Sequence, residues 1–264
     1  MCKDNPTVLK SCQNYIIKNL LYFLMSKELF LGSKLSDEAF LLENAEHHHC
    51  IRVTRHKLGD EILISDFNGS IFQGRIDEIF KEQTSIQIIA ETKSEKLNPK
   101  IKIAISPTQQ MDRFEWFVEK AVECGVHEII PLKCDRTENT RVKTERIAKI
   151  MLAAAKQTHR AFIPICQEII PFKKFIDQCN VAQKFICHCL DGHTGNLGEL
   201  YNPNEDVVVL IGPAGDFSLE EIKSATTNGF INADLGNFRL RTETAGIISC
   251  SILSQKKMLS EKNN

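Results

Sequence analysis

Short apolar strands alternate with amphipathic helices from residue 101 to near the C-terminus, and this alternation restricts the fold more than any other feature of the sequence. The predicted strands are residues 101–106, 126–132, 184–190 and 207–211, and two of the predicted helices are residues 113–124 and 144–159. Elements that alternate in this way form a mostly parallel sheet with helices on both faces. The sequence therefore predicts an α/β domain over residues 99–264.

Capping residues mark where helices of this domain begin. Asp112 is expected to cap the helix that starts at the next residue. Ser218 and Glu221 have the spacing of a capping box, in which each side chain binds the other residue's main-chain N–H. Thr242 is expected to cap a last helix that ends near residue 257.

The N-terminal part of the chain has a different pattern. Residues 25–96 contain short predicted strands, and Asn68-Gly69 separates two of them, residues 61–66 and 71–79, as in a hairpin. Several short strands at this spacing indicate a small β-barrel. The polar residues 93–100 are interpreted as a linker between the two domains.

Residues 1–24 resemble neither domain and are expected to be an N-terminal extension of undefined role, with Met25 as a candidate start. No segment of the sequence reaches the roughly 20 apolar residues that a membrane-spanning helix needs. A secretory signal peptide is not expected either, because Lys18 and Asn19 interrupt the most apolar early stretch. We expect a cytoplasmic protein without a membrane partner.

Charge and cysteine content exclude two classes of function. The 33 basic and 34 acidic side chains nearly cancel, so bulk charge does not direct this chain to nucleic acid, although a local basic face is still compatible with RNA binding. The ten cysteines form no CxxC pair and are expected to be reduced thiols. Residues 47–50 and 187–189 lack a second ligand pair at zinc-site spacing, so we predict no metal.

A glycine-containing bend follows the predicted strand 207–211. It contains Gly212, Pro213 and Gly215, and a helix begins shortly after it. Glycines allow a ligand close to main-chain groups, and ligands of parallel sheets bind beyond the carboxyl ends of strands. The alternative is an ordinary strand-to-helix loop.

A second bend, residues 235–243, contains Gly236 and then Arg239 and Arg241 close to a helix start. Arginines at such a place suit an anion or a polarised carbonyl group. A solvated charged turn is the alternative. The Walker loop, GxGxxG after the first strand of the α/β domain, GxSxG and HExxH are all missing from the sequence.

Together the two bends resemble the RsmE family, the 16S ribosomal RNA uracil-N3 methyltransferases of the SPOUT superfamily. Residues 212–218 are similar to the family's Gly-Pro-Glu-Gly-(Gly/Asp)-Phe-Ser, and residues 235–245 to its Leu-Gly-x-x-x-Leu-Arg-x-Glu-Thr-Ala. Further similarity lies at residues 49–60, 113–125 and 156–160, and the whole resemblance covers residues 28–257. One departure is Ala214, where the family has Glu.

The resemblance implies a PUA-like β-barrel that contacts RNA and a SPOUT α/β domain with a deep trefoil knot at its C-terminal end. It implies S-adenosylmethionine as the cofactor, held largely by main-chain groups. It also implies a homodimer with its site near the subunit interface, acting on N3 of a uridine in 16S rRNA, within the small ribosomal subunit.

Roles for individual residues follow from this chemistry. Removing the N3 proton of uracil places negative charge on two carbonyl oxygens, which Arg241 or Arg239 would stabilise. Glu243 could accept the proton, or else pair with an arginine and stabilise the helix N-terminus. The cofactor would contact Ile211, Gly212, Pro213, Gly215, Leu235, Gly236, Leu240 and Thr242. In the barrel, RNA phosphates would contact Arg52, Arg55, Lys57 and Arg75.

Three alternatives stay open. The first is another SPOUT methyltransferase, acting on transfer RNA or on a ribose 2′-oxygen. The second is a non-catalytic RNA-binding protein, which would be favoured if Ala214 disables the glycine bend. The third is a nucleotide-phosphate binder, against which the absence of a lysine after the bend counts.

Overall fold

The computed structural model describes residues 27–94, 99–190 and 192–262. The chain divides into two compact units. The first comprises Met1–Glu95 with Lys156–Phe162, and the second comprises Lys96–Ala155 with Ile163–Asn264. The expected extension at residues 1–24 lies outside the described residues.

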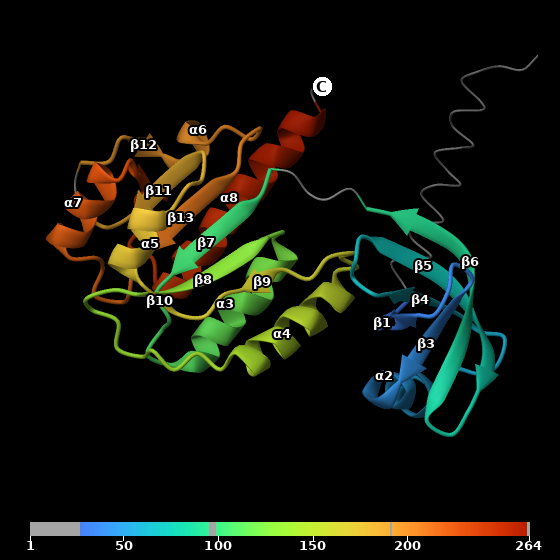
Figure 1. Ribbon diagram of the computed structural model, residues 1–264. Coiled ribbons are helices and arrows are strands. Elements are labelled where there is room, and N and C mark those ends of the chain that lie inside the picture. Colours follow the sequence, from blue (N-terminus) through green and yellow to red (C-terminus); the bar gives the residue numbers. More distant parts are fainter. Residues whose placement is uncertain (1–26, 95–98, 191, 263–264) are drawn as a thin grey trace, which may run out of the picture. The chain divides into compact units, whose positions relative to one another are not determined.

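The first unit is a curled, mainly antiparallel six-stranded sheet (Figure 1). Its strands, in spatial order, are β1 (Leu29–Leu31), β4 (Glu61–Ser65), β5 (Ser70–Ile79), β6 (Gln83–Lys93), β3 (Ala39–Glu43) and β2 (Ser33–Lys34). Alternate apolar residues point to the concave side and form a core that includes Phe30, Phe40 and Phe72. In the described residues β1 and β2 do not pair with each other, so the predicted barrel is an open half-barrel.

Two short helical segments follow β3, namely α2 (Asn44–His48) and the π-helix η1 (His49–Val53). The buried His47 lies 2.8 Å from the hydroxyl of Thr84 on β6, measured from Nδ1 to Oγ1. Lys156 donates to both carboxylate oxygens of Glu46 at 2.8 Å. These bonds hold the helical segments in place within the first unit.

The hairpin predicted at Asn68-Gly69 is present, but its turn is longer than two residues. The positive φ angles belong to Phe67 and Gly69 and not to Asn68. Phe67 is buried, and its N–H donates to the Ser65 hydroxyl at 2.8 Å. Burial of this ring therefore shapes the turn, in place of the expected Asn-Gly pair.

The second unit contains an eight-stranded sheet in which every strand pair is parallel. The spatial order is β10 (Ile170–Pro171), β8 (Glu128–Lys133), β7 (Ile101–Ile105), β13 (Val207–Ile211), β11 (Gln183–Cys187), β14 (Ile231–Asp234) and β12 (Gly195–Asn196), and β9 (Ile165–Cys166) also pairs with β8. The predicted α/β domain is confirmed in this sheet and in its helices.

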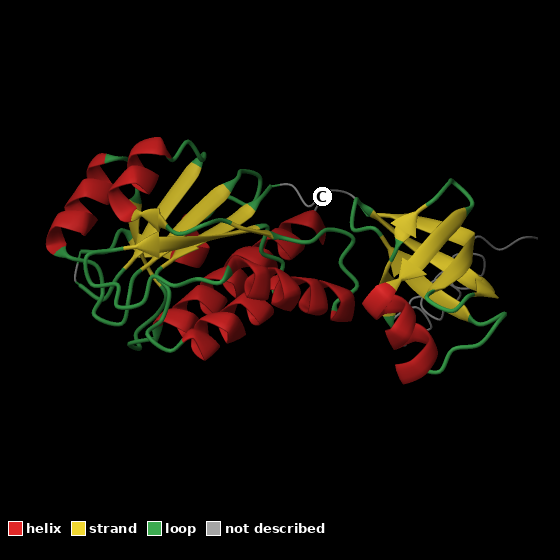
Figure 2. Ribbon diagram, turned by 60° about the horizontal axis from the view of Figure 1, so that its bottom comes forward, coloured by secondary structure: helices red, strands yellow, loops and turns green. Residues whose placement is uncertain are grey.

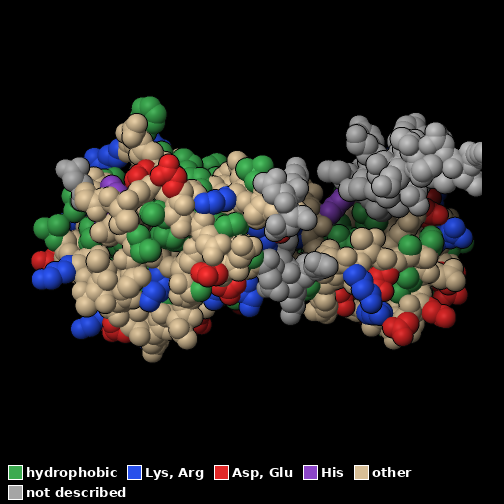
Figure 3. All heavy atoms as spheres, turned by 90° about the horizontal axis from the view of Figure 1, so that it is seen from above, with side chains coloured by type: hydrophobic (Ala, Val, Ile, Leu, Met, Phe, Trp, Pro, Cys, Tyr) green, Lys and Arg blue, Asp and Glu red, His purple; other side chains and the backbone are tan. Residues whose placement is uncertain are grey.

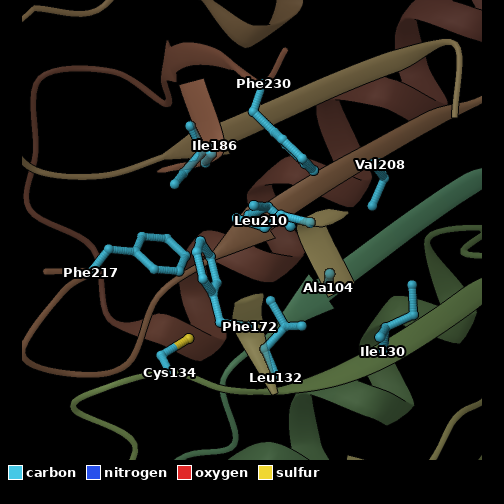
Figure 4. Packing of buried hydrophobic residues seen from close by; sticks show 12 residues of the cluster. Ala104, Ile130, Leu132, Cys134, Phe172, Ile186, Val208, Leu210, Phe217 and Phe230 are labelled. Atoms are coloured by element: carbon cyan, nitrogen blue, oxygen red, sulfur yellow. The ribbon is translucent and has the colours of Figure 1, made fainter. Parts of the chain in front are cut away.

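Helices cover both faces of this sheet (Figure 2). They are α3 (Met111–Glu123), α4 (Thr144–Gln157), α5 (Phe172–Gln178), α6 (Leu197–Leu200), α7 (Leu219–Thr227) and α8 (Thr242–Lys262). On the face of α5 and α7, Phe172, Phe217 and Phe230 pack on Leu210 and Ile186 of the central strands (Figure 4). On the other face α8 packs against α3, β7 and β13.

The capping residues agree only in part with the predictions. Ser218 and Glu221 form the expected capping box at the start of α7. The prediction that Asp112 caps a helix is wrong, because Asp112 lies inside α3, which begins at Met111. The prediction that Thr242 caps the last helix is also wrong. Thr242 is the first residue of α8, and its hydroxyl donates to the carbonyl oxygen of Gly212.

On the face in Figure 3, basic and acidic side chains are interspersed, as the near-zero net charge leads one to expect. Among the described helices, none is long and apolar enough to cross a membrane. The trefoil knot implied by the resemblance stays a prediction.

Candidate functional site

The site lies where the central strands of the second unit end at the same level. Register pairs Ile211 at the end of β13 with Ile105 of β7 on one side and Cys187 of β11 on the other. Cys187 in turn pairs with Ala233 of β14. Because parallel strands have their carboxyl ends at one edge, the loops that follow these strands meet there.

The bend after β13 is fixed by contacts from three directions. The carboxylate of Asp216, a residue with φ of 64°, accepts from the N–H of Cys189 at 2.7 Å and from Phe217 at 2.8 Å. Arg136, from the loop after β8, donates to the carbonyl oxygen of Gly215. The Ser218 hydroxyl donates to Asp135 at 2.7 Å. The bend is therefore a defined shape and not a loose loop.

The second bend is joined to the first by one buried hydrogen bond. Thr242 Oγ1 donates to the carbonyl oxygen of Gly212 at 3.0 Å. At its other end, the N–H of Gly236 donates to Asp234 at 2.9 Å. Gly236 has φ of +109°, a conformation that side chains with a Cβ rarely adopt. The two glycine-containing bends thus face each other.

Between the bends lies a cavity of about 1230 Å³, which can hold a ligand the size of a nucleoside. All of the predicted cofactor and catalytic residues line it: Ile211, Gly212, Pro213, Gly215, Leu235, Gly236, Leu240, Thr242, Arg239, Arg241 and Glu243. The structure therefore brings together two sets of residues that the sequence placed in separate motifs.

Ala214, the departure from the family motif, is exposed and lines the cavity. None of the contacts that shape the bend comes from its side chain, because Asp216, Arg136 and Thr242 supply them. The shape of the bend thus does not depend on a carboxylate at position 214, which weakens the case for a disabled loop.

Three charged residues of the second bend differ in their environment. Arg239 and Arg241 are exposed at the cavity. Glu243 lies in the first turn of α8 and is only 8% exposed. No ion pair within the described residues joins Glu243 to an arginine, so the predicted pairing is absent. Its carboxylate is at the cavity wall and near the helix N-terminus.

Several lining residues were not predicted from the sequence. Arg113 lies in the first turn of α3, and Arg136 and Glu138 lie in the loop after β8. A further group lies at the end of β11 and just after it: Cys187, His188, Cys189, Leu190 and His193. The sequence signal that could have found the last group is the predicted strand 184–190, whose carboxyl end belongs at the same edge.

The end of β11 is a partly buried, weakly polar wall. The rings of His188 and His193 stack with centroids 4.6 Å apart. Burial lowers the pKa of His188 below its ordinary value of 6.5, and His193 lowers it further. Burial also raises the pKa of the Cys187 thiol, so this cysteine is a neutral apolar group and not a nucleophile.

The predicted phosphate contacts lie in the first unit. Arg52 is in η1, Arg55 and Lys57 follow it, and all three are exposed. Arg75 on β5 is exposed and pairs with Glu61 at 3.3 Å. Only Arg75 lies on a strand, so these four residues do not form one strand face.

The cavity walls fit a nucleoside cofactor held by main-chain groups. Within the described chain, the N–H groups of Asn237, Phe238, Arg239 and Leu240 donate no hydrogen bond. Free N–H groups at a cavity wall can bind the polar atoms of a ligand. The space beside Gly236 is also open, with no atom within 4 Å of where a Cβ would lie.

Comparison with known proteins decides the family. Residues 95–254, which include every residue that lines the cavity, match the model of the RNA methyltransferase domain family. The chain belongs to this family.

Individual relatives align with most of the chain. A chain from Porphyromonas gingivalis, described as a probable rRNA-methyltransferase, is 33% identical, with TM-score 0.81 over 88% of this chain and 99% of that one. A methyltransferase from Legionella pneumophila, solved with S-adenosylmethionine bound, is 26% identical, with TM-score 0.76 over 86% and 96% of the two chains. Ribosomal RNA small subunit methyltransferase E of Bacillus subtilis is 25% identical and aligns over 83% of this chain and 91% of its own.

Proposed function

We propose that this protein transfers the methyl group of S-adenosylmethionine to N3 of a uridine in the RNA of the small ribosomal subunit. One observation supports this function above all. The Thr242–Gly212 hydrogen bond places both family motifs at one cavity, in a chain that belongs to an RNA methyltransferase family. Relatives named ribosomal RNA small subunit methyltransferase E support small-subunit RNA as the substrate, and the N3 position follows from the resemblance of the two bends to the RsmE family.

The cofactor fits between the bends. The main chain at Gly212, Leu235 and Gly236 and the free N–H groups after Gly236 would hold its polar atoms, while Ile211 and Leu240 would contact its apolar parts. When bound, S-adenosylmethionine supplies an electrophilic methyl group on a sulfonium sulfur, whose departure needs no proton. The protein's own residues therefore act on the uracil.

Arg241 and Arg239 would act on the charge that forms in the base. Loss of the N3 proton spreads negative charge over the two flanking carbonyl oxygens, and a guanidinium in contact with one of them lowers the cost of that charge. Both arginines are exposed at the cavity, so they can reach a base that enters it. Positioning of N3 in line with the methyl carbon supplies much of the remaining acceleration.

Glu243 is the acidic side chain of the second bend that lines the cavity, and we propose that its carboxylate accepts the proton from uracil N3. Its burial at the start of α8 holds it in one place.

In the first unit, Arg52, Arg55, Lys57 and Arg75 would bind RNA phosphates, which predicts a salt-dependent affinity. We further propose a homodimer with the knotted chain path of the SPOUT superfamily.

The test is mass mapping of small-subunit RNA from cells that lack the protein. We expect one uridine to lose a methyl group at N3, and the purified protein with S-adenosylmethionine to restore it. Arg241→Ala should abolish this activity and leave cofactor binding largely intact. Full turnover by that variant would remove Arg241 from the mechanism.

Mass mapping extended to transfer RNA, together with calorimetry, separates the alternatives. A ribose-methylated nucleoside or a modified transfer RNA would favour a different SPOUT activity. Failure of S-adenosylmethionine to bind in calorimetry would favour a non-catalytic RNA-binding protein.

A further inference from the structure

Phe238 is the most exposed large hydrophobic side chain in the described residues, at 85%, and it lines the cavity in the second bend. A phenylalanine that packs in a core removes a large apolar area from water, which this ring does not do. No other aromatic ring of the described chain pairs with it. Packing in the core of the fold therefore does not explain why a phenylalanine stands at this position.

The loop that carries Phe238 is anchored at both ends. On one side the N–H of Gly236 donates to Asp234, and on the other the N–H of Ala245 donates to the carbonyl oxygen of Arg241 at 2.8 Å. The ring therefore lies at the cavity on a short segment between two fixed points. A loop anchored in this way can present a side chain to a ligand with a small loss of main-chain entropy.

The charge around the cavity indicates which kind of ligand the cavity binds. The exposed charged side chains that line it are four arginines and one acid: Arg113, Arg136, Arg239, Arg241 and Glu138. The other acids that line it, Asp216, Asp234 and Glu243, are partly or fully buried, and the first two accept main-chain hydrogen bonds. An exposed rim with this excess of positive charge complements a polyanion such as RNA.

We propose that Phe238 is a stacking platform for a base of the RNA strand that enters the site, and so a positioning residue for the target nucleotide. This inference rests on the proposed function. Proteins recognise single-stranded or splayed RNA bases by stacking them on aromatic side chains. Leu190 and Leu219 are also exposed at the cavity, but neither offers a π face.

The first test compares Phe238→Leu with Phe238→Tyr on small ribosomal subunits from cells that lack the protein. Phe238→Leu keeps an apolar side chain and removes the ring, so we expect kcat/KM for the subunits to fall by about 5- to 100-fold. Phe238→Tyr keeps the ring and should stay within about threefold of the parent. Calorimetry should give an unchanged affinity for S-adenosylmethionine in both variants.

The second test observes stacking directly. Trp116 is the single tryptophan of the chain, so Trp116→Phe with Phe238→Trp places the only indole at position 238. Short oligouridylate should quench its fluorescence. The control places the indole at Leu259, which is 62% exposed on α8 and does not line the cavity, and there we expect no quenching.

Each contrary result overturns the inference without affecting the proposed function. If Phe238→Leu methylates subunits with the parent kcat/KM, the ring does not position RNA. If Phe238→Leu alters the cofactor affinity, or the molecular mass in solution, the ring contacts the cofactor or a second copy of the chain. Absence of methylation by the parent protein would instead reject the proposed function, while quenching of the position-238 indole would still test the stacking.

Discussion

The hydroxyl of Thr242 shows how one residue assembles this site. Its hydrogen bond to Gly212 joins residues 30 apart in the chain and is buried. A sequence places threonine at a helix start and suggests a cap, because the local geometry is common. The actual acceptor belongs to another loop, and no local pattern could identify it.

Thr242→Val tests this link, since valine keeps the shape of threonine and lacks the hydroxyl. It leaves the buried carbonyl of Gly212 without its donor, which should lower the free energy of unfolding by about 1–3 kcal/mol. We also expect weaker binding of S-adenosylmethionine, because the two bends lose their connection. Urea unfolding and calorimetry measure the two effects. An unchanged affinity in a destabilised variant would show that this bond matters for the fold and not for the site.

The sequence did not identify Arg136 as a residue of the site, for the same reason that it wrongly assigned Thr242 as a helix cap. It contacts Gly215, 79 residues further along the chain, and only the parallel order of β7, β8 and β13 brings the two loops together. Gly212, Gly215 and Gly236 were found because glycine at a strand end is itself a signal. Residues identified by type were thus predictable, and residues identified by a distant partner were not.

At the scale of elements, the strands were predicted best. β13 has the predicted bounds because Val207–Ile211 is a continuous apolar run that is entirely buried. Helix starts were predicted where two residues support each other, as Ser218 and Glu221 do, and not at Asp112, whose carboxylate accepts from the adjacent Arg113 N–H inside the first turn. A single capping residue is a weak signal, because its side chain has other acceptable partners.

Gly246 sets the distance between α8 and the elements beneath it. A Cβ at this position would lie 2.5 Å from Phe117 of α3 and 2.9 Å from Ile105 of β7. Gly246→Ala should therefore overpack the interface and lower the free energy of unfolding by about 1–3 kcal/mol, despite the better helix propensity of alanine. Denaturant unfolding measures this change. A variant more stable than the parent would mean that the helices separate at no cost.

At the scale of the whole molecule, the division of the chain was only partly visible in the sequence. The composition changes near residue 96, where the structure also divides the chain. The segment Lys156–Phe162 nevertheless belongs to the first unit, where Asn68 forms an isolated β-bridge with Phe162. This segment carries no change of composition, so its membership follows from contacts alone.

The stability of the molecule should depend on pH through His188. Its pKa is lowered in the folded state, so the unfolded chain binds the proton more readily. The stability that neutral His188 contributes is fully present above pH 6.5, which is the ordinary pKa of histidine. It is lost as the pH falls through the lower pKa of the folded state. Unfolding midpoints at pH 7.5 and about pH 5.5 should therefore differ less in His188→Gln than in the parent. An equal difference in both proteins would exclude His188 as a source of the pH dependence.

The central claim is that the bends at Gly212 and Gly236 enclose the site for S-adenosylmethionine, and calorimetry with that compound tests it most directly. Gly236→Ala and Gly59→Ala form a matched pair, because both glycines have positive φ and open space beside them, and only Gly236 lines the cavity. The account predicts that the parent and Gly59→Ala bind with the same affinity and that Gly236→Ala binds at least about tenfold more weakly. Equal affinities in all three proteins would contradict it.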